Sequence, residues 1–139
     1  MTDDELVLKK LSEIETYVRE LRTLCRPEEI ERDVREERFV AHTLQLAIQA
    51  ALDVASHIVS DERLGEPREN RELFELLGRH GWITEGWAET LGKMAGFRNL
   101  LVHDYAKIDL AIVREVTEHR LGDLLQFAEA IRKRVLASR

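Results

Sequence analysis

Cysteine and long apolar runs are scarce in this sequence, and each scarcity excludes a class of protein. A single cysteine, Cys25, permits no internal disulfide, so we expect a reducing compartment. No apolar run approaches the roughly 18 residues of a membrane span, and the acidic N-terminus lacks the pattern of a secretion signal. We therefore expect a cytoplasmic protein that does not enter membranes.

Several common catalytic motifs are also missing. The five histidines include no pair at metal-ligand spacing, and no cysteine cluster accompanies them. The sequence has neither a glycine-rich phosphate loop nor the sharp turn that exposes a nucleophilic serine. We therefore expect no metal site and no bound cofactor.

Residues that form turns are rare. Only two prolines and seven glycines occur in 139 residues, and no segment alternates in the manner of a strand. This composition favours long helices, and the length fits one domain over residues 1–139.

Basic residues are fewer than acidic residues in the whole sequence, but the two halves of the sequence differ in this balance. The net charge of −6 argues against non-specific binding of nucleic acid. Residues 1–75 hold 11 Lys and Arg against 19 Asp and Glu, whereas residues 76–139 hold 10 against 8. Any anion site should therefore be local and lie in the second half.

Apolar residues recur at helical spacing along most of the chain. This pattern predicts an all-α fold, a single up-and-down bundle of about five helices. Thr84 and Asp109 suit the caps of the last two helices, and Asp61 to Asn70 reads as the clearest loop. The expected helices cover about residues 6–24, 28–59, 71–79, 85–105 and 110–136.

The apolar second helix carries one polar line, formed by Gln45, Gln49, Asp53 and His57 at intervals of four residues. One interpretation is a stripe that faces solvent. The other is the border of a cleft, with Asp53 as the acidic partner of Arg98.

A cationic run, residues 132–134, lies near the end of the last predicted helix. Cations there suit the helix dipole and a solvated end. The alternative interpretation is a contact with an RNA backbone.

The stretch from Arg98 to Tyr105 holds the most distinctive chemistry. At about 100° per residue, Arg98 lies in the middle of an apolar helix face. A buried guanidinium needs a carboxylate, an anionic ligand or a partner surface. His103 can move a proton near neutral pH, and Tyr105 adds a phenol on the Arg98 face.

On a straight helix, His103 stands about 140° from Arg98, so one helix does not easily bring the two side chains together. Two copies facing each other across a two-fold axis would do so, and so would a kink. The residues alone leave open whether His103 is catalytic or a surface histidine.

The string Arg-x4-His-x-Tyr, at Arg98, His103 and Tyr105, resembles the signature of HEPN domains in the HepT-like toxin family. Residues 93–105 as a whole, the expected helices and the chain length are similar too. The resemblance implies an HEPN-like homodimer, or a higher even oligomer, that is a metal-independent endoribonuclease for tRNA or mRNA. In such domains the RNA 2′-hydroxyl attacks the adjacent phosphate and leaves a cyclic phosphate and a 5′-hydroxyl.

Carried over to this sequence, the resemblance implies that His103 moves the proton and that Arg98 binds the phosphate. Asn99 would hold the phosphate or position His103, and Asp53 is a second candidate supporting residue. The resemblance further implies a partner, an MntA-like minimal nucleotidyltransferase antitoxin that transfers AMP to Tyr105. The added negative charge beside Arg98 would compete with RNA phosphate.

A second hypothesis needs no catalysis. The chain would be a helical dimer that binds and supports a nucleotidyltransferase. The net negative charge and the separation of Arg98 from His103 favour it. Cleavage of RNA by the purified chain would exclude it.

Overall fold

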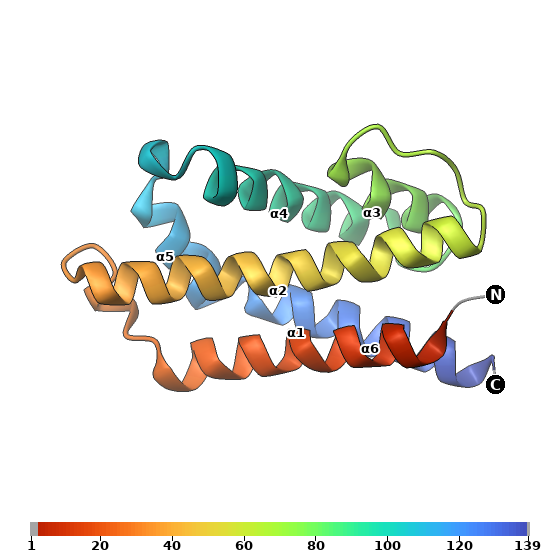
Figure 1. Ribbon diagram of the computed structural model, residues 1–139, viewed down its shortest axis with the longest axis horizontal. Coiled ribbons are helices and arrows are strands. Elements are labelled where there is room, and N and C mark those ends of the chain that lie inside the picture. The colour runs from red at the N-terminus through yellow and green to blue at the C-terminus, as the bar shows by residue number, and fades with distance from the viewer. Residues whose placement is uncertain (1–2, 139) are drawn as a thin grey trace.

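The computed structural model describes residues 3–138, and these form six α-helices and two short 3-10 turns, with no β-strand (Figure 1). The α-helices are α1 (Asp4–Leu24), α2 (Val34–Asp61), α3 (Asn70–Arg79), α4 (Glu85–His103), α5 (Leu110–His119) and α6 (Leu121–Ala137). The 3-10 turns are η1 (Pro27–Glu29) and η2 (Tyr105–Lys107). The predicted all-α class is confirmed, but the predicted number of helices is not.

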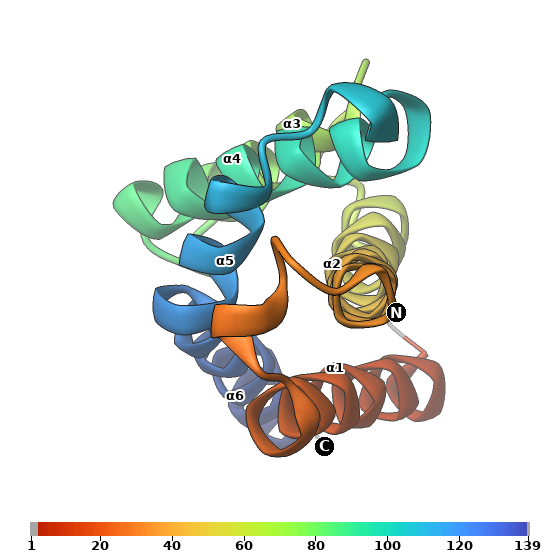
Figure 2. The same ribbon diagram turned by 90° about the vertical axis from the view of Figure 1, so that its left-hand side faces the viewer.

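Helix α2 is the longest helix and packs against each of the other five α-helices of the described residues. It packs against α1 on one side and against α3 and α4 on the other, while α5 and α6 complete the ring (Figure 2). Its buried residues include five alanines, whose small side chains let the neighbouring helices approach closely: Ala41, Ala47, Ala50, Ala51 and Ala55. The prediction that this helix is buried among several others is confirmed.

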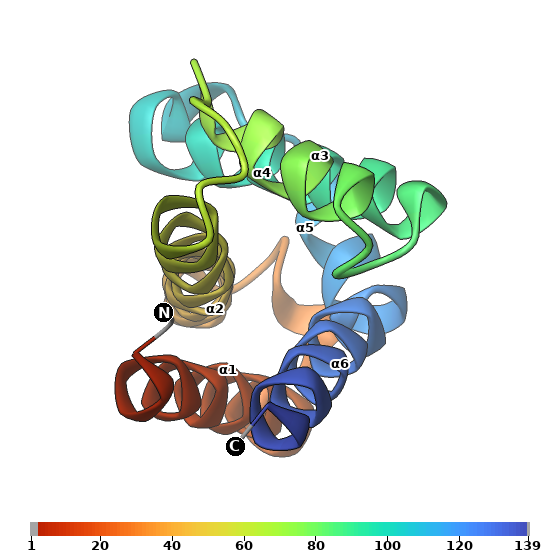
Figure 3. The same cartoon turned by 90° about the vertical axis from the view of Figure 1, so that its right-hand side faces the viewer.

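The two outer layers are antiparallel helix pairs. α1 and α6 lie side by side below α2, and α3 folds back along α4 above it (Figures 1 and 3). Phe74 of α3 and Phe127 of α6 meet edge to face in the core, with ring centroids 5.7 Å apart. Such a contact suits the charge distribution of two aromatic rings and ties the layers together.

The predicted last helix is wrong, because it is two helices, α5 and α6. They are separated at Arg120, whose φ of −117° and ψ of −2° interrupt the helix. Gly122 follows, and glycine has a low helix propensity. The buried positions keep a spacing of three or four residues through the break, so the pattern alone could not reveal it. They include Val113, Thr117, Leu121, Leu124, Ala128, Ile131 and Val135.

The start of the predicted second helix is also wrong. Residues 27–29 form η1, residues 30–32 form a turn, and α2 begins only at Val34. The side chain of Asp33 accepts a hydrogen bond of 2.8 Å from the backbone N–H of Arg35. An aspartate in this capping role ends the turn and starts a new helix.

Helix α4 begins as predicted and ends earlier than predicted. The Thr84 hydroxyl accepts from the backbone N–H of Trp87 at 3.2 Å, and Asp109 caps α5 in the same manner. However, α4 stops at His103, so Tyr105 lies in η2 and not on the α4 helix. None of the helices described is both long and apolar enough to cross a membrane.

Candidate active site at the end of helix α4

Arg98 is half-buried in the last turns of α4, as its place on the apolar face predicted. Its neighbours on that face, Leu91, Met94 and Leu101, are buried in the core. One guanidinium nitrogen, Nη1, donates to the side-chain oxygen of Asn99 at 3.1 Å. The helix thus holds the stem of Arg98 against protein while its charged end reaches a polar edge.

The guanidinium of Arg98 has no acidic partner among residues 3–138. Its Nε atom is buried and has no hydrogen-bond acceptor. A charged group with an unsatisfied buried donor is costly, and an anion placed beside it would remove much of that cost. Arg98 is therefore available for an anionic ligand.

Asn99 and Asn70 brace this arginine. The side-chain oxygen of Asn99 accepts from Arg98 and also from the amide nitrogen of Asn70, at 3.5 Å. Asn70 is the first residue of α3, so the α3–α4 pair fixes the position of Asn99. In this chain Asn99 therefore orients Arg98, and it makes no hydrogen bond to His103 within the described residues.

His103 is the last residue of α4, and its side chain is exposed. Within residues 3–138, the side-chain hydrogen bond of Arg98 goes to Asn99 and not to His103. An exposed imidazole can exchange protons with solvent and with a ligand. Within one chain, the Arg98 guanidinium and the His103 imidazole therefore lie apart near the end of α4.

Tyr105 is held by a residue far away in the sequence. Its hydroxyl donates a 2.7 Å hydrogen bond to Oε2 of Glu37, in the first turns of α2. Burial, with the hydrogen bond and negative charge of Glu37, raises the pKa of Tyr105 to about 12. The phenol is therefore protonated at neutral pH.

A small hollow of about 170 Å³ lies beside Tyr105, between α2 and the end of α4. Its lining includes Arg38, His42 and Gln45 from successive turns of α2, together with Leu101 and Tyr105. The Arg38 side chain is 72% exposed and has its Nε atom 4.0 Å from Oε2 of Glu37. The hollow thus combines an aromatic ring with groups that can donate to an anion.

The predicted ion pair between Asp53 and Arg98 is wrong. Oδ1 of Asp53 accepts from Gln49 at 2.8 Å, and Oδ2 lies 3.3 Å from the Lys10 ammonium. Both oxygens are therefore engaged on the α1 side of α2. A direct supporting role for Asp53 at the α4 site has no contact to support it.

The polar line that includes Asp53 is also not a simple solvent-facing stripe. All four of its side chains are half-buried. His57 Nε2 accepts from the backbone N–H of Asp3 at 3.1 Å, and Asp53 pairs with Lys10. Much of the line therefore lies along the seam between α1 and α2.

The cationic run near the C-terminus is largely held by protein. Arg132 makes two hydrogen bonds to the carboxylate of Glu15, at 2.7 and 2.8 Å. Arg134 lies 3.9 Å above the centre of the Trp82 ring and donates to the carbonyl oxygen of Gly81. These contacts favour a structural role over an RNA contact.

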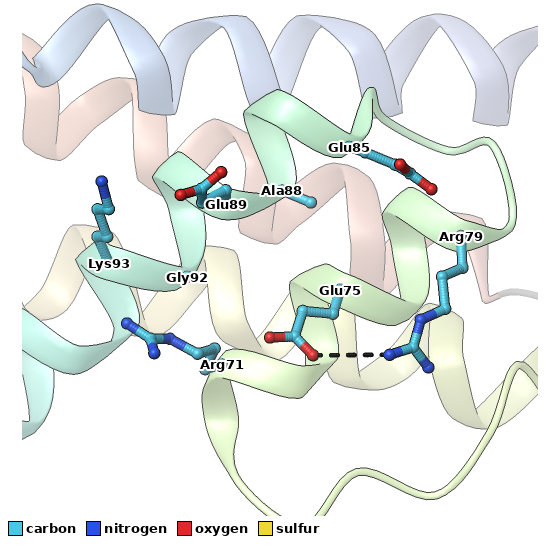
Figure 4. Close-up of a pocket in the computed structure, with 8 residues that line it drawn as sticks. All are labelled: Arg71, Glu75, Arg79, Glu85, Ala88, Glu89, Gly92 and Lys93. Atoms are coloured by element: carbon cyan, nitrogen blue, oxygen red, sulfur yellow. Dashed lines mark ion pairs between the residues drawn. The ribbon is translucent and has the colours of Figure 1, made fainter.

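A larger pocket of about 430 Å³ lies between α3 and the first half of α4 (Figure 4). Arg71 and Lys93 lie at one end, and Glu75 and Arg79 form an ion pair at the other. Its lining mixes both charges and contains none of the predicted site residues. Elsewhere in residues 3–138, no three His, Cys, Asp or Glu side chains gather as metal ligands would.

Glu37 and Asn70 are the two site residues that sequence reasoning missed. Glu37 is one of several glutamates between positions 28 and 37, and nothing in the pattern distinguishes it. Asn70 lies at a loop end, where an asparagine is common. Only the packing of α2 and α3 against α4 identifies them.

Known proteins are similar to this chain in sequence and in fold. Residues 9–131 match the family described as Ribonuclease HepT-like. The mRNA nuclease HepT of Shewanella oneidensis is 31% identical over 130 residues, which are 93% of this chain and 98% of that protein. The tRNA nuclease HepT of Aphanizomenon flos-aquae is 41% identical over 66 residues, 48% of this chain and 45% of that protein.

Solved structures of other proteins are also similar to this chain. A tri-AMPylated Shewanella oneidensis HEPN toxin, in complex with an MNT antitoxin, matches with a TM-score of 0.86 and 31% identity over 96% of this chain and 99% of that chain. A cytosolic Bacillus subtilis protein of unknown function, YutE, matches with a TM-score of 0.88 over 99% of this chain and 93% of that chain. At 18% identity, that second likeness concerns the fold alone. On the family match and the full-length relative, this chain belongs to the HepT-like ribonuclease family.

Proposed function

We propose that this chain is the toxin of a two-component toxin–antitoxin system, a metal-independent endoribonuclease that cuts tRNA or mRNA. The observation that carries the proposal is the Arg98 guanidinium, which is half-buried, braced by Asn99 and without an acidic partner in residues 3–138. The names of the relatives, mRNA nuclease and tRNA nuclease, support the same activity. RNA is abundant in the cytoplasm, so we place the protein there.

In the proposed reaction, the 2′-hydroxyl of one nucleotide attacks the adjacent phosphate. The 5′-oxygen of the next nucleotide leaves, and a cyclic phosphate forms. His103 moves the proton, and Arg98 binds the phosphate and its developing charge. Asn99 holds Arg98 in place and so acts as a positioning residue.

The proposal includes a homodimer. Arg98 and His103 do not meet within one chain, whereas two copies of the α4 end facing each other across a two-fold axis would place both pairs in one groove. The exposed apolar side chains of Leu100 and Val102, which lie between Arg98 and His103 in the sequence, suit such an interface. Light scattering at micromolar concentration should give the mass of two chains.

The proposal also includes a nucleotidyltransferase antitoxin of the MntA type. It would transfer AMP from ATP to Tyr105, as the AMPylated Shewanella toxin in complex with its MNT antitoxin suggests. A phosphodiester on Tyr105 would bring negative charge and bulk to the edge where RNA must bind. Modified protein should therefore cut RNA slowly or not at all.

The first test incubates purified protein with total tRNA and mRNA in the presence of EDTA. Wild type should cleave RNA, and His103→Ala should lose roughly 10²- to 10⁴-fold, the usual contribution of one proton-transfer group. His119→Ala is a matched control, because His119 is also an exposed histidine at the last residue of a helix.

Equal cleavage by His103→Ala and wild type would exclude the role of His103. If wild type does not cleave, the mass of the Tyr105 peptide decides between two explanations. Added AMP would mean a silenced enzyme. An unmodified tyrosine would favour the non-catalytic dimer that supports a nucleotidyltransferase.

A further inference from the structure

The hydrogen bond between Tyr105 and Glu37 bears on how AMP would be transferred to Tyr105. AMP transfer requires the Tyr105 oxygen to lose its proton as it bonds to phosphorus. The proton now lies on a 2.7 Å hydrogen bond to Oε2 of Glu37, and the Glu37 side chain is only 20% exposed. Within residues 3–138, no other acceptor bonds to this hydroxyl.

The surroundings make a proton acceptor necessary. Burial and the adjacent carboxylate raise the pKa of Tyr105 to about 12, so the nucleophilic phenolate is very rare at neutral pH. A carboxylate in direct contact can take the proton during the reaction, as the aspartate of protein kinases does for a substrate hydroxyl.

We infer that Glu37 is the general base for AMP transfer to Tyr105, so that the toxin supplies a catalytic residue to its own inactivation. The inference rests on the proposed function, because it assumes that Tyr105 is the acceptor. The antitoxin would bring the co-reactant, a nucleoside triphosphate. The toxin would bring both the nucleophile and the base.

In the proposed AMP transfer, one bond to the α-phosphorus forms and one breaks. The Tyr105 oxygen forms a bond to the α-phosphorus, and the bond from that phosphorus to the bridging oxygen breaks. Pyrophosphate leaves, and the phenolic proton passes to Oε2 of Glu37. Once protonated, Glu37 is neutral and no longer repels the phosphodiester beside it.

The hollow next to Tyr105 suits the incoming phosphate. Arg38 and His42 line it from successive turns of α2 and can donate hydrogen bonds to phosphate oxygens. Arg38 also lies 4.0 Å from the Glu37 carboxylate and is otherwise largely exposed. These are the charged and titratable groups that α2 presents to Tyr105, besides Glu37.

The experiment measures AMP transfer with the purified complex of toxin and nucleotidyltransferase, using labelled ATP and single-turnover conditions. Glu37→Gln keeps an oxygen that can accept the Tyr105 hydrogen bond but cannot take its proton. Its transfer rate should fall about 100-fold or more. Glu36→Gln is the matched control, since it removes the same charge one residue away and should transfer at close to the wild-type rate.

The pH dependence separates a base from a structural residue. In Glu37→Gln, raising the pH should restore transfer, because phenolate formed in solution needs no base. A wild-type enzyme with its own base should gain far less over the same pH range. Rates are divided by those of Glu36→Gln, which cancels the pH response of the antitoxin.

Three outcomes are distinguishable. No AMP on wild-type Tyr105 would overturn the modification in the proposed function. AMP on wild type with an equal rate in Glu37→Gln would overturn the role of Glu37 alone. If thermal melting shows that Glu37→Gln does not fold, Glu37→Asp replaces it, and a rate equal to wild type despite the shorter carboxylate would also overturn the inference.

Discussion

Arg98 and Arg132 are both partly buried arginines on core helices, yet their guanidinium groups end in opposite situations. Arg132 makes a two-pronged contact with Glu15, which joins α6 to α1. Arg98 reaches only the amide oxygen of Asn99 and leaves its Nε without an acceptor. Arg132 thus forms a structural ion pair, whereas Arg98 has no acidic partner within residues 3–138.

This difference supports the proposed role of Arg98 in binding an anion. A fold that needed only stability would pair or replace a buried guanidinium, because unpaired burial costs free energy. Arg132 satisfies that expectation, and the pairing lowers the pKa of Glu15 and raises that of Arg132. Arg98 violates it in the last turns of α4, the helix that ends at the exposed His103.

The largest expected effect is on RNA cleavage. Arg98→Ala should lower the cleavage rate about 10²- to 10³-fold, the usual loss when one group that stabilises transition-state charge is removed. The cleavage rate of Arg98→Lys should lie between those of wild type and Arg98→Ala, because lysine keeps the charge but lacks the planar, forked donors. Rates are measured on a defined RNA under single-turnover conditions.

Arg132→Ala provides the control for that experiment. Its guanidinium is engaged with Glu15 on α1 and should not contribute to cleavage. If Arg98→Ala and Arg132→Ala cut RNA at the same rate, the functional distinction between the two arginines fails.

The sequence could predict the position of Arg98 on the apolar face of its helix, because that position depends only on nearby residues. Helical periodicity places Arg98 among Leu91, Met94 and Leu101, and all three are buried as expected. Periodicity also predicted the buried α2, and the residue types at Thr84 and Asp109 predicted the caps. These features depend on residues within one or two turns of each other.

The sequence could not predict contacts between distant residues. Asp53 pairs with Lys10 and not with Arg98, and Tyr105 bonds to Glu37 across 68 positions. Such partners depend on how the helices pack. Before the packing is known, any of several acidic residues in α2 could be the partner. The break at Arg120 was hidden for a different reason, because the buried spacing of α5 continues into α6.

A smaller effect is expected on stability, with opposite results for the two arginines. Arg132→Ala should lower the free energy of unfolding by about 1 kcal/mol, since its ion pair is partly exposed and screened. The melting temperature should fall by roughly 3 °C in a chain of this size. Arg98→Ala should be as stable as wild type or more stable, because it removes an unsatisfied buried donor.

Thermal melts of the two variants at equal concentration test this contrast. A large loss of stability in Arg98→Ala would mean that Arg98 is held in a structural contact after all. In a homodimer, that contact would come from the second copy, and dilution should then reduce the difference between the variant and wild type.

The smallest effect is a change in that stability difference with pH. The hydrogen bond from Arg132 is the main reason that the pKa of Glu15 lies below its ordinary value of 4.5, although burial opposes the shift. A carboxyl whose pKa is depressed on folding contributes stability above its unfolded pKa and loses it as the pH falls through its folded pKa. The stability advantage of wild type over Arg132→Gln should therefore be constant from about pH 7 to about pH 5.5 and shrink below about pH 4.5.

Urea unfolding at several pH values measures this difference in the free energy of unfolding. The difference between wild type and Arg98→Ala should stay constant over the same pH range, because no carboxylate in residues 3–138 pairs with Arg98. A slope of equal size for both arginines would mean that Arg98, too, is bound to an acidic group in the folded protein.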